Sequence, residues 1–407
     1  MEQETTFDSH HINKTFETAN KKLDKLAYGN GELIKEFIGT YRFKKKQLSV
    51  HRKVALICRI KNIATTLNKP LKDLNVEDIK LFVTRMQEAE NKRSKPFSLH
   101  TWSSQMKDLK VFLRWLKPKQ VREILEECKT DLEVQDAYSD PKRKLSDKDL
   151  IDENTFLKLL NTANRKQKAI LSLLYGCGLR AGELLNLSRA DIKSLDDGSV
   201  VLTVEGKTGS RTMKLKKDLA FHVLDLINES NHGTALFYKD NLQRMDYSAL
   251  TYELQSIAVH SGLSKWIRTK KGAIKKYVGY NISPLRFRRT HATWCLINMN
   301  TPQAKMRIWG SVHSNMDKVY SRVTHADSDS DYDKANGDKE QIKPKESLLK
   351  GRTCFKCNKT FGITTEFCSD CSLPLDPNKI QKMFQPDDRV ERLEKEMKAI
   401  KELLIKR

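Results

Sequence analysis

Apolar residues recur at helical spacing through most of the chain, so the sequence predicts a mostly helical α+β protein. The stretch after Leu74 shows the pattern most clearly. Asn75 is a typical N-cap residue and acidic residues follow it in the first turn, which marks a helix start. Apolar residues then fall on one face of the predicted helix, at Ile79, Phe82, Val83 and Met86.

A second helix is predicted from about Ser98 to Pro118, where proline ends it. Its apolar side consists of Trp102, Met106, Leu109, Phe112, Leu113 and Leu116. Lys107, Lys110 and Arg114 project from another face. Basic side chains beside an apolar stripe suit a helical module that lies on a phosphate backbone. The alternative is that these basic residues form an ordinary solvated face of the helix and contact no DNA.

The clearest strand pattern lies in the middle of the chain. Residues 200–204 are apolar or β-branched and predict a strand, and residues 205–210 favour a turn. Residues 212–215 then predict a second strand that runs back beside the first. This pattern predicts a β-hairpin with Lys207 at its tip. Helical spacing elsewhere in this region predicts helices over 153–163 and 166–175, from Ala181 onward, and again up to about residue 320.

Changes in composition divide the chain into domains and connectors. The predicted segments are a polar N-terminal arm (1–40), a helical domain (41–130), a linker (131–150), a mixed α+β domain (151–325), a flexible connector (326–350), a cysteine-containing module (351–380) and a terminal helix (385–407). Apolar residues of the terminal helix have a/d spacing, which allows a short coiled coil, although a lone surface helix is the alternative.

The chain is strongly basic, since 75 Lys and Arg residues against 52 Asp and Glu residues give a net charge of +23 among 407 residues. Such a charge predicts a polyanionic partner, most often nucleic acid; a basic surface kept for solubility is the alternative. No apolar run approaches the roughly 18–20 residues of a membrane span, so we expect no membrane partner. The polar, acidic start predicts no signal peptide. We therefore expect an intracellular protein of the cytoplasm or nucleoid.

Four of the eight cysteines form two CxxC pairs with ten residues between them. Cys354, Cys357, Cys368 and Cys371 match the ligand spacing of a tetrahedral Zn²⁺ site of the zinc-ribbon type. Because four thiolates leave no coordination position open, we predict one structural zinc ion. Four accidental thiols or two disulfides are the alternatives. Such ribbons bind DNA, bind protein or only stabilise a tail, and the sequence does not choose among these.

Three basic residues and one tyrosine stand in contexts that suit phosphoryl transfer. Arg180 follows a glycine-rich break, Lys207 lies on the predicted hairpin, and Arg288 lies within a basic helix. Guanidinium groups bind phosphate oxygens bidentately and stabilise the charge that builds on them. The hydroxyl of Tyr320 can attack phosphorus and form a covalent intermediate.

These residues and their neighbours resemble the tyrosine recombinases of the phage-integrase family, which exchange DNA strands at specific sites. The resemblance is carried by the stretch from Tyr175 to Leu187 (YGCGLRAGELLNL), Gly206-Lys207, the stretch from Pro284 to Thr293, and Trp309-Gly310 ahead of Tyr320. It spans about residues 150–325, and the preceding helical region resembles the family's core-binding domain.

The resemblance implies that Arg180 and Arg288 bind the scissile phosphate, that Lys207 protonates the leaving 5′ oxygen, and that Tyr320 forms a 3′-phosphotyrosyl link. It implies site-specific recombination of double-stranded DNA by a tetramer, with no cofactor and no small-molecule substrate. Glu183 is implied to be a structural partner of the arginine region.

Two positions depart from the family pattern. Leu285 and Ser311 stand where the family usually has proton-transferring side chains, and losing one such group costs on the order of 10²–10⁴ in rate. The enzyme would then be impaired, unless His291 or His313 substitutes. The alternative function is a non-catalytic DNA-binding or regulatory protein on a decayed recombinase scaffold. A topoisomerase-like relaxing enzyme would share the same tyrosine chemistry.

Overall fold

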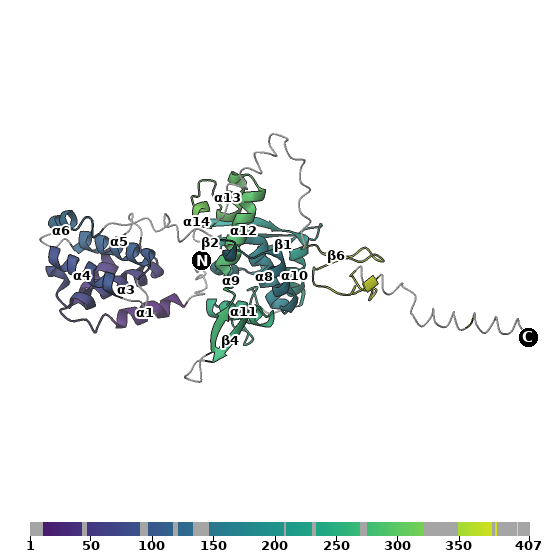
Figure 1. The fold of residues 1–407 in the computed structure, drawn as a ribbon, viewed down its shortest axis with the longest axis horizontal. Coiled ribbons are helices and arrows are strands. Elements are labelled where there is room, and N and C mark those ends of the chain that lie inside the picture. Colours follow the sequence, from purple (N-terminus) through teal and green to yellow (C-terminus); the bar gives the residue numbers. More distant parts are fainter. Residues whose placement is uncertain are drawn as a thin grey trace, which may run out of the picture. The chain divides into compact units, whose positions relative to one another are not determined.

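The computed structural model describes residues 11–42, 47–89, 97–116, 121–132, 146–206, 209–229, 233–268, 275–320, 349–376, 379–380 and 397 (Figure 1). The chain divides into two compact units, Met1–Lys144 and Leu145–Arg407. Within the described ranges, no helix is long and apolar enough to cross a membrane. The elements are mainly helices with small antiparallel sheets, as the sequence predicts.

The first unit is a bundle of helices. They are α1 (Ile12–Lys21), α2 (Asn30–Thr40), α3 (Val50–Leu67), α4 (Val76–Glu88), α5 (Leu99–Leu116) and α6 (Val121–Glu127). Helix α4 begins as predicted, because Asn75 accepts a hydrogen bond from the backbone of Asp78 and the Asp78 carboxylate accepts one from the backbone of Asn75. The predicted apolar face of this helix is buried.

Residues 12–40 do not form the separate polar arm that the composition suggests. Leu33, Ile34, Phe37 and Ile38 of α2 are buried in the same core as α3, α4 and α5. The rings of Phe37 and Phe112 meet edge to face at 5.2 Å, which joins α2 to α5. The composition predicts a polar arm because apolar residues are outnumbered by polar ones here, yet the apolar residues of α2 are buried together.

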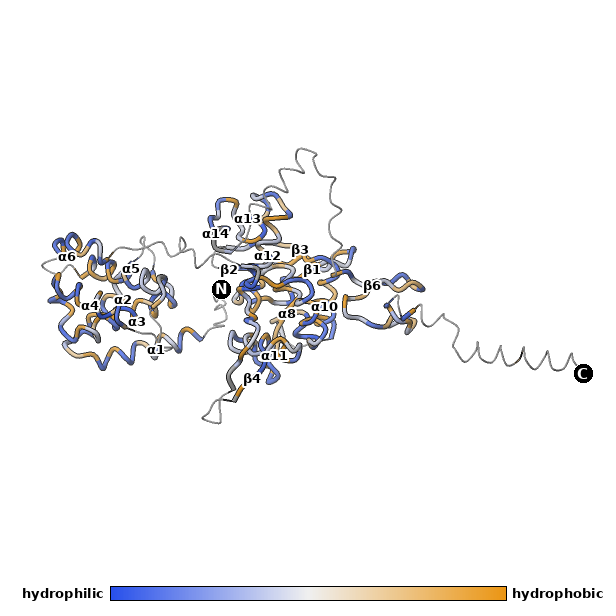
Figure 2. Tube along the Cα trace, viewed as in Figure 1, coloured by the Kyte–Doolittle hydropathy of each residue, from blue (hydrophilic) through white to orange (hydrophobic). Residues whose placement is uncertain are grey.

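The second unit contains helices around a small sheet. The helices are α7 (Glu153–Thr162), α8 (Arg165–Cys177), α9 (Ala181–Asn186), α10 (Lys217–Glu229), α11 (Tyr247–His260), α12 (Pro284–Asn298), α13 (Thr301–Trp309) and α14 (Asp317–Tyr320). Helices α10 and α12 both pack against α8, which is buried along most of its length. Along the helices of both units the tube in Figure 2 changes between hydrophobic and hydrophilic stretches, as expected for helices that bury one face.

The predicted hairpin is present as β2 (Val200–Gly206) and β3 (Gly209–Leu215), with Val200 opposite Leu215 and Gly206 opposite Gly209. The strand β1 (Ile192–Ser194) extends it to a three-stranded antiparallel sheet in the order β1-β2-β3. Lys207 lies outside the described residues. Alternate side chains of β2 and β3 face the core, which fixes the register of the hairpin.

Between the hairpin and residue 320, where the sequence predicts helices, the structure also has a ribbon that the sequence did not predict. The strands β4 (Ser264–Arg268) and β5 (Lys275–Gly279) form an antiparallel two-stranded ribbon between α11 and α12. Figure 1 shows this ribbon projecting from the body of the second unit at the end of α11. The strands carry basic side chains among their aromatic ones, so they lack the apolar alternation from which strands are recognised.

The cysteine-containing module has its own small sheet, formed by β6 (Arg352–Thr353) and β7 (Thr360–Phe361). It packs on α10, where Phe221 lies against the cysteine cluster and the backbone N–H of Gly351 donates to the Asp218 carboxylate at 2.6 Å. Most of the predicted connector (326–350) and of the predicted terminal helix (385–407) lies outside the described residues.

Candidate active site and cysteine cluster

The carboxylate of Glu183 is the centre of a cluster of guanidinium groups. Helix α8 ends at Gly178, whose φ of 58° suits glycine, and Arg180 then caps the start of α9. Glu183 accepts hydrogen bonds from the backbone N–H of Arg180 at 2.9 Å and from its Nη1 at 2.6 Å. Burial alone would raise the pKa of Glu183, but the hydrogen bonds and charges of Arg211 and Arg180 outweigh it and lower the pKa to about 2.

Arg211 on β3 is a member of this cluster that sequence reasoning missed. Its Nη1 and Nη2 donate to the two oxygens of Glu183 at 2.7 and 2.6 Å, and both side chains are buried. Such a bidentate pair fixes the carboxylate in position and orientation. The sequence contains one sign of this role. Arg211 alternates with Met213 and Leu215 along β3, which places an arginine on the buried face of the strand.

Arg288 lies in the first half of α12, which begins with the Ser283 cap and Pro284. Its side chain is almost completely buried. Nη1 donates to the carbonyl of Gly178 at 2.7 Å and Nη2 to the carbonyl of Ile308 at 2.8 Å. Nη1 is also 3.9 Å from the Glu183 carboxylate. Burial, followed by the nearby charge of Arg180, lowers the pKa of Arg288 to about 10, so it remains protonated at neutral pH.

Tyr320 is at the end of α14, and its ring covers Arg288. The guanidinium carbon of Arg288 is 5.5 Å from the centroid of the Tyr320 ring, a cation–π contact. Trp309 meets the same ring nearly edge-on at 6.4 Å. The structure thus brings three of the four predicted catalytic residues together, because Arg180 and Arg288 lie at Glu183 and Tyr320 lies against Arg288.

The two positions that depart from the family pattern are on the surface. Leu285 is 45% exposed and Ser311 is exposed. His291 does not replace the missing groups, because it is buried with its Nδ1 at 3.1 Å from the carbonyl of Tyr175. Burial lowers the pKa of His291 to about 3, so it is neutral at physiological pH. His313 is exposed, and its backbone N–H donates to the Ser311 hydroxyl at 3.3 Å.

The residues predicted to contact DNA lie on α5 in the first unit. Lys107 and Arg114 are exposed and Lys110 is half-buried. Between them, the buried Asp108 binds Arg52 and Arg59 of α3, which anchors α5. The predicted basic face is therefore fixed to the rest of the bundle by an internal ion pair.

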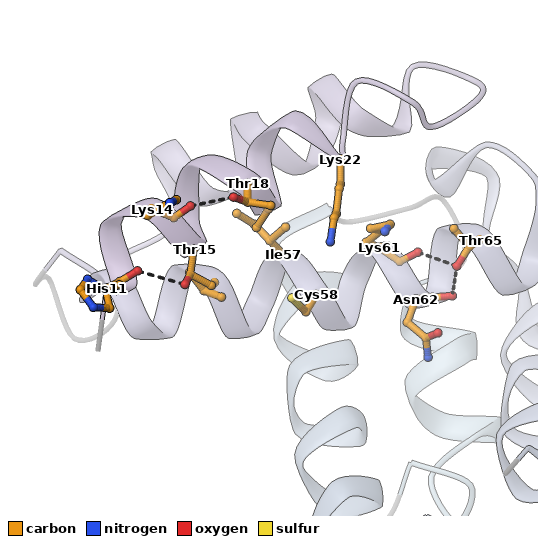
Figure 3. A pocket seen from close by; sticks show the side chains of 12 residues that line it. His11, Lys14, Thr15, Thr18, Lys22, Ile57, Cys58, Lys61, Asn62 and Thr65 are labelled. Carbon is orange, nitrogen blue, oxygen red and sulfur yellow. Dashed lines mark hydrogen bonds between the residues drawn. The ribbon is translucent and has the colours of Figure 1, made fainter. Parts of the chain in front are cut away.

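The same unit has a basic groove between α1 and α3, with a volume of about 530 Å³ (Figure 3). Lys14, Lys22 and Lys61 line it together with threonine and apolar side chains, and none of its lining residues is acidic. The threonine hydroxyls there donate to backbone carbonyls one turn earlier in their own helices. The groove adds to the basic surface of this unit.

The four predicted metal ligands lie together, with the sulfur atoms of Cys354, Cys357, Cys368 and Cys371 all within 4.8 Å of one another. The two CxxC turns have matching backbones. The residue after each second cysteine, Asn358 or Ser372, has a φ of 55° and donates its N–H to the carbonyl of the first cysteine at 2.9 Å. Two equivalent turns presenting four sulfurs are the donor arrangement that tetrahedral zinc requires. The cluster could therefore hold a zinc ion.

Comparison with known proteins agrees with this arrangement. The model of the phage integrase family matches residues 149–327. Tyrosine recombinase XerA of Pyrococcus horikoshii is 27% identical over 175 residues, which are 42% of this chain and 56% of that protein. Tyrosine recombinase XerD of Oceanobacillus iheyensis is 25% identical over 196 residues, 45% of this chain and 60% of that protein. The chain thus spans little more than half the length of the curated relatives it matches.

Matches to two solved structures cover most of this chain. The Tn1549 transposon integrase in complex with circular intermediate DNA is 18% identical, with 74% of this chain and 98% of that chain covered and a TM-score of 0.47. XerH recombinase bound to its difH substrate in a post-cleavage complex is 12% identical, with 82% and 98% covered and a TM-score of 0.48. The match to the phage integrase family model includes Arg180, Arg288 and Tyr320, the three site residues that the structure gathers.

Proposed function

We propose that the chain is a site-specific tyrosine recombinase that cuts and rejoins double-stranded DNA. The observation that carries the proposal is the contact of the Tyr320 ring with the guanidinium of Arg288, beside the Glu183–Arg180 pair. A tyrosine against one guanidinium, with a second guanidinium paired to the neighbouring Glu183, supplies the nucleophile and the cations that attack on a phosphodiester requires. The curated relatives named above are tyrosine recombinases, which supports the same reaction here.

In the proposed reaction, Arg180 and Arg288 bind the non-bridging oxygens of the scissile phosphate. The Tyr320 oxygen forms a bond to phosphorus as the bond to the 5′ oxygen breaks, and Lys207 gives a proton to that leaving oxygen. The 3′-phosphotyrosyl link keeps the energy of the phosphodiester. A 5′ hydroxyl from another strand then attacks the link, re-forms the phosphodiester and releases the tyrosine.

Glu183 and Arg211 act on this reaction by holding Arg180. The carboxylate of Glu183 receives both the backbone and the side chain of Arg180, and Arg211 holds the carboxylate from the other side. The remaining donors of the Arg180 guanidinium, whose side chain is 28% exposed, stay accessible to a phosphate. Preorganised donors of this kind avoid reorganisation in the transition state.

Further parts of the proposal concern partners and metal. Exchange between two duplexes breaks four strands and each chain supplies one Tyr320, so we infer a tetramer on DNA. Lys107, Lys110 and Arg114 would contact phosphates from the first unit. One structural Zn²⁺ would be held by the four-cysteine cluster, and the tyrosine chemistry would need no cofactor.

The test is a covalent-adduct assay on nicked suicide substrates built from the DNA that flanks the gene. The wild-type chain should form a protein–DNA adduct that survives denaturant. Tyr320→Phe should form none, while Tyr28→Phe, which removes an exposed hydroxyl in the first unit, should form as much as wild type. An adduct that persists in Tyr320→Phe would refute the assignment of the nucleophile.

A non-catalytic DNA-binding protein is the second candidate, because Leu285 and Ser311 provide no titratable group where proton transfer is expected. Tight, site-specific binding with no adduct on the same nicked site would establish this candidate and remove the first. Sequence-independent relaxation of supercoiled plasmid would instead indicate a topoisomerase.

A further inference from the structure

The β4–β5 ribbon is a basic projection that the reaction scheme above leaves without a role. Its two strands contain four basic residues among ten positions and no acidic ones. These are Lys265, Arg268, Lys275 and Lys276. By the register, Lys265 and Lys276 share one face of the ribbon, and Arg268 and Lys275 share the other. A ribbon of this composition is suited to a polyanionic partner.

The two faces of the ribbon differ. On one face Trp266 meets Tyr277 edge-on at 5.4 Å and stacks against Tyr252 of α11 at 6.2 Å. The hydroxyls of Tyr277 and Ser264 are 2.8 Å apart, and Tyr277 also donates to the carbonyl of Tyr280. This aromatic face therefore attaches the ribbon to the body of the second unit.

The opposite face is directed to solvent. Lys265 pairs with Val278 and Ile267 pairs with Lys276 across the two strands. Each of these cross-strand pairs therefore joins a lysine to a branched apolar residue. Ile267 is 41% exposed and Val278 is 36% exposed. Lysine with exposed apolar side chains, and no carboxylate among these ten positions, suits phosphates and sugars better than a protein surface of mixed charge.

The base of the ribbon is tied to the helix that carries Arg288. Tyr280, just past β5, lies under the guanidinium of Arg286 of α12 at 3.9 Å, and Arg286 donates to the carbonyl of Asn281 at 2.9 Å. Five residues of strand at about 3.4 Å each extend the ribbon about 17 Å from that base. These contacts fix the base of the ribbon to α12.

We propose that the exposed face of the β4–β5 ribbon binds duplex DNA through its phosphates. The inference rests on the proposed function for its choice of DNA as the polyanion. It adds a contact surface in the second unit to the one predicted on α5.

The test measures how binding to a short duplex of arbitrary sequence depends on salt. All chains carry Tyr320→Phe, so covalent trapping does not affect the affinity. The ribbon variant is Lys265→Ala with Lys276→Ala. The matched control is Lys158→Ala with Lys193→Ala, which removes the same charge from exposed positions on α7 and β1.

Each lysine that neutralises a phosphate adds about one to the slope of log affinity against log salt. The ribbon variant should lower the slope by about two between roughly 50 and 200 mM salt, and the control should leave it unchanged. The inference is overturned if the ribbon variant has the same salt dependence as the wild-type sequence at these lysines. It is also overturned if the control variant loses as much slope as the ribbon variant. Circular dichroism and the fluorescence of Trp266 report whether the ribbon variant is folded.

The failure of the proposed function is read separately, from the adduct assay on the chain with Tyr320 intact. Absence of an adduct together with a reduced ribbon slope would reject the recombinase and retain the DNA-binding ribbon. An adduct together with an unchanged ribbon slope would retain the recombinase and reject the DNA-binding ribbon.

Discussion

Replacing Arg211 with methionine tests whether the buried Glu183–Arg211 pair supports the candidate site. Methionine keeps much of the volume of the arginine stem but removes both hydrogen bonds to the carboxylate. Breaking a buried ion pair by removing one partner costs about 3–5 kcal/mol. Glu183 keeps its contacts with Arg180, so we expect a loss near the lower end of that range at pH 7.

The pH dependence gives an independent magnitude. The pKa of Glu183 is lowered from 4.5 to about 2 in the folded chain, and a difference of about 2.5 units corresponds to roughly 3 kcal/mol at 1.36 kcal/mol per unit. Because the folded pKa lies below the unfolded one, this stability is present above about pH 4.5 and is lost as the pH falls toward 2. Arg211→Met raises the folded pKa, so its deficit relative to wild type should shrink as the pH falls through this window.

The assay is urea unfolding of the full chain followed by circular dichroism, from pH 7 downward. Lys214→Met is the matched control on the same strand, since its partner Asp197 is on the surface and such pairs contribute about 0–1 kcal/mol. A double-mutant cycle with Glu183→Gln isolates the pair. If Arg211→Met and Lys214→Met lose the same stability at pH 7, or if the Arg211→Met deficit does not depend on pH, the reasoning is wrong.

Three further predictions address the remaining features. Leu285→His should restore a proton-transferring side chain at an exposed position and speed adduct formation by on the order of 10² in single-turnover assays, whereas Leu285→Phe should not. Cys354→Ser should abolish the binding of one zinc ion per chain, measured by elemental analysis, and should leave adduct formation intact. If the variant lost DNA cleavage while its catalytic domain stayed folded, the metal would not be purely structural. Asp108→Asn should lower the free energy of unfolding of the first unit by about 3 kcal/mol, because Arg52 and Arg59 lose a buried charged partner. Thermal unfolding measures this loss, and a change below about 0.5 kcal/mol would show that the contacts of Asp108 with the two arginines contribute little to stability.

Elements with strong local signals could be predicted from the sequence. Asn75 and Asp78 cap α4 as the pattern indicates, and the β2–β3 hairpin has the predicted strands, because capping and alternation depend on residues a few positions apart. The four cysteines likewise gather as their spacing predicts. Glu183 was expected to be a partner of the arginine region, and its contact with Arg180 one turn earlier is local as well.

Features that depend on distant contacts could not be predicted in this way. The pairing of Arg211 with Glu183 joins residues 28 positions apart and requires knowing that both face one buried side of the sheet. The β4–β5 ribbon buries only one aromatic face, so its pattern shows little of the apolar periodicity from which strands are recognised. Its position is fixed by stacking on Tyr252, a contact that no local rule provides.

The position of Arg288 shows why a motif gives the identity of a site residue but only part of its role. A phosphate ligand needs free donors, and Nη1 and Nη2 of Arg288 each use one of their two N–H groups on the carbonyls of Gly178 and Ile308. Those two carbonyls lie next to the segments that carry Arg180 and Ser311, so the guanidinium joins the segments while its charge faces the site. Nε is buried without a hydrogen-bond partner among the described residues, and the Tyr320 ring lies over the group. If Arg288 binds the scissile phosphate as proposed, the Tyr320 ring that lies over its guanidinium would have to move aside before the phosphate could reach this charge.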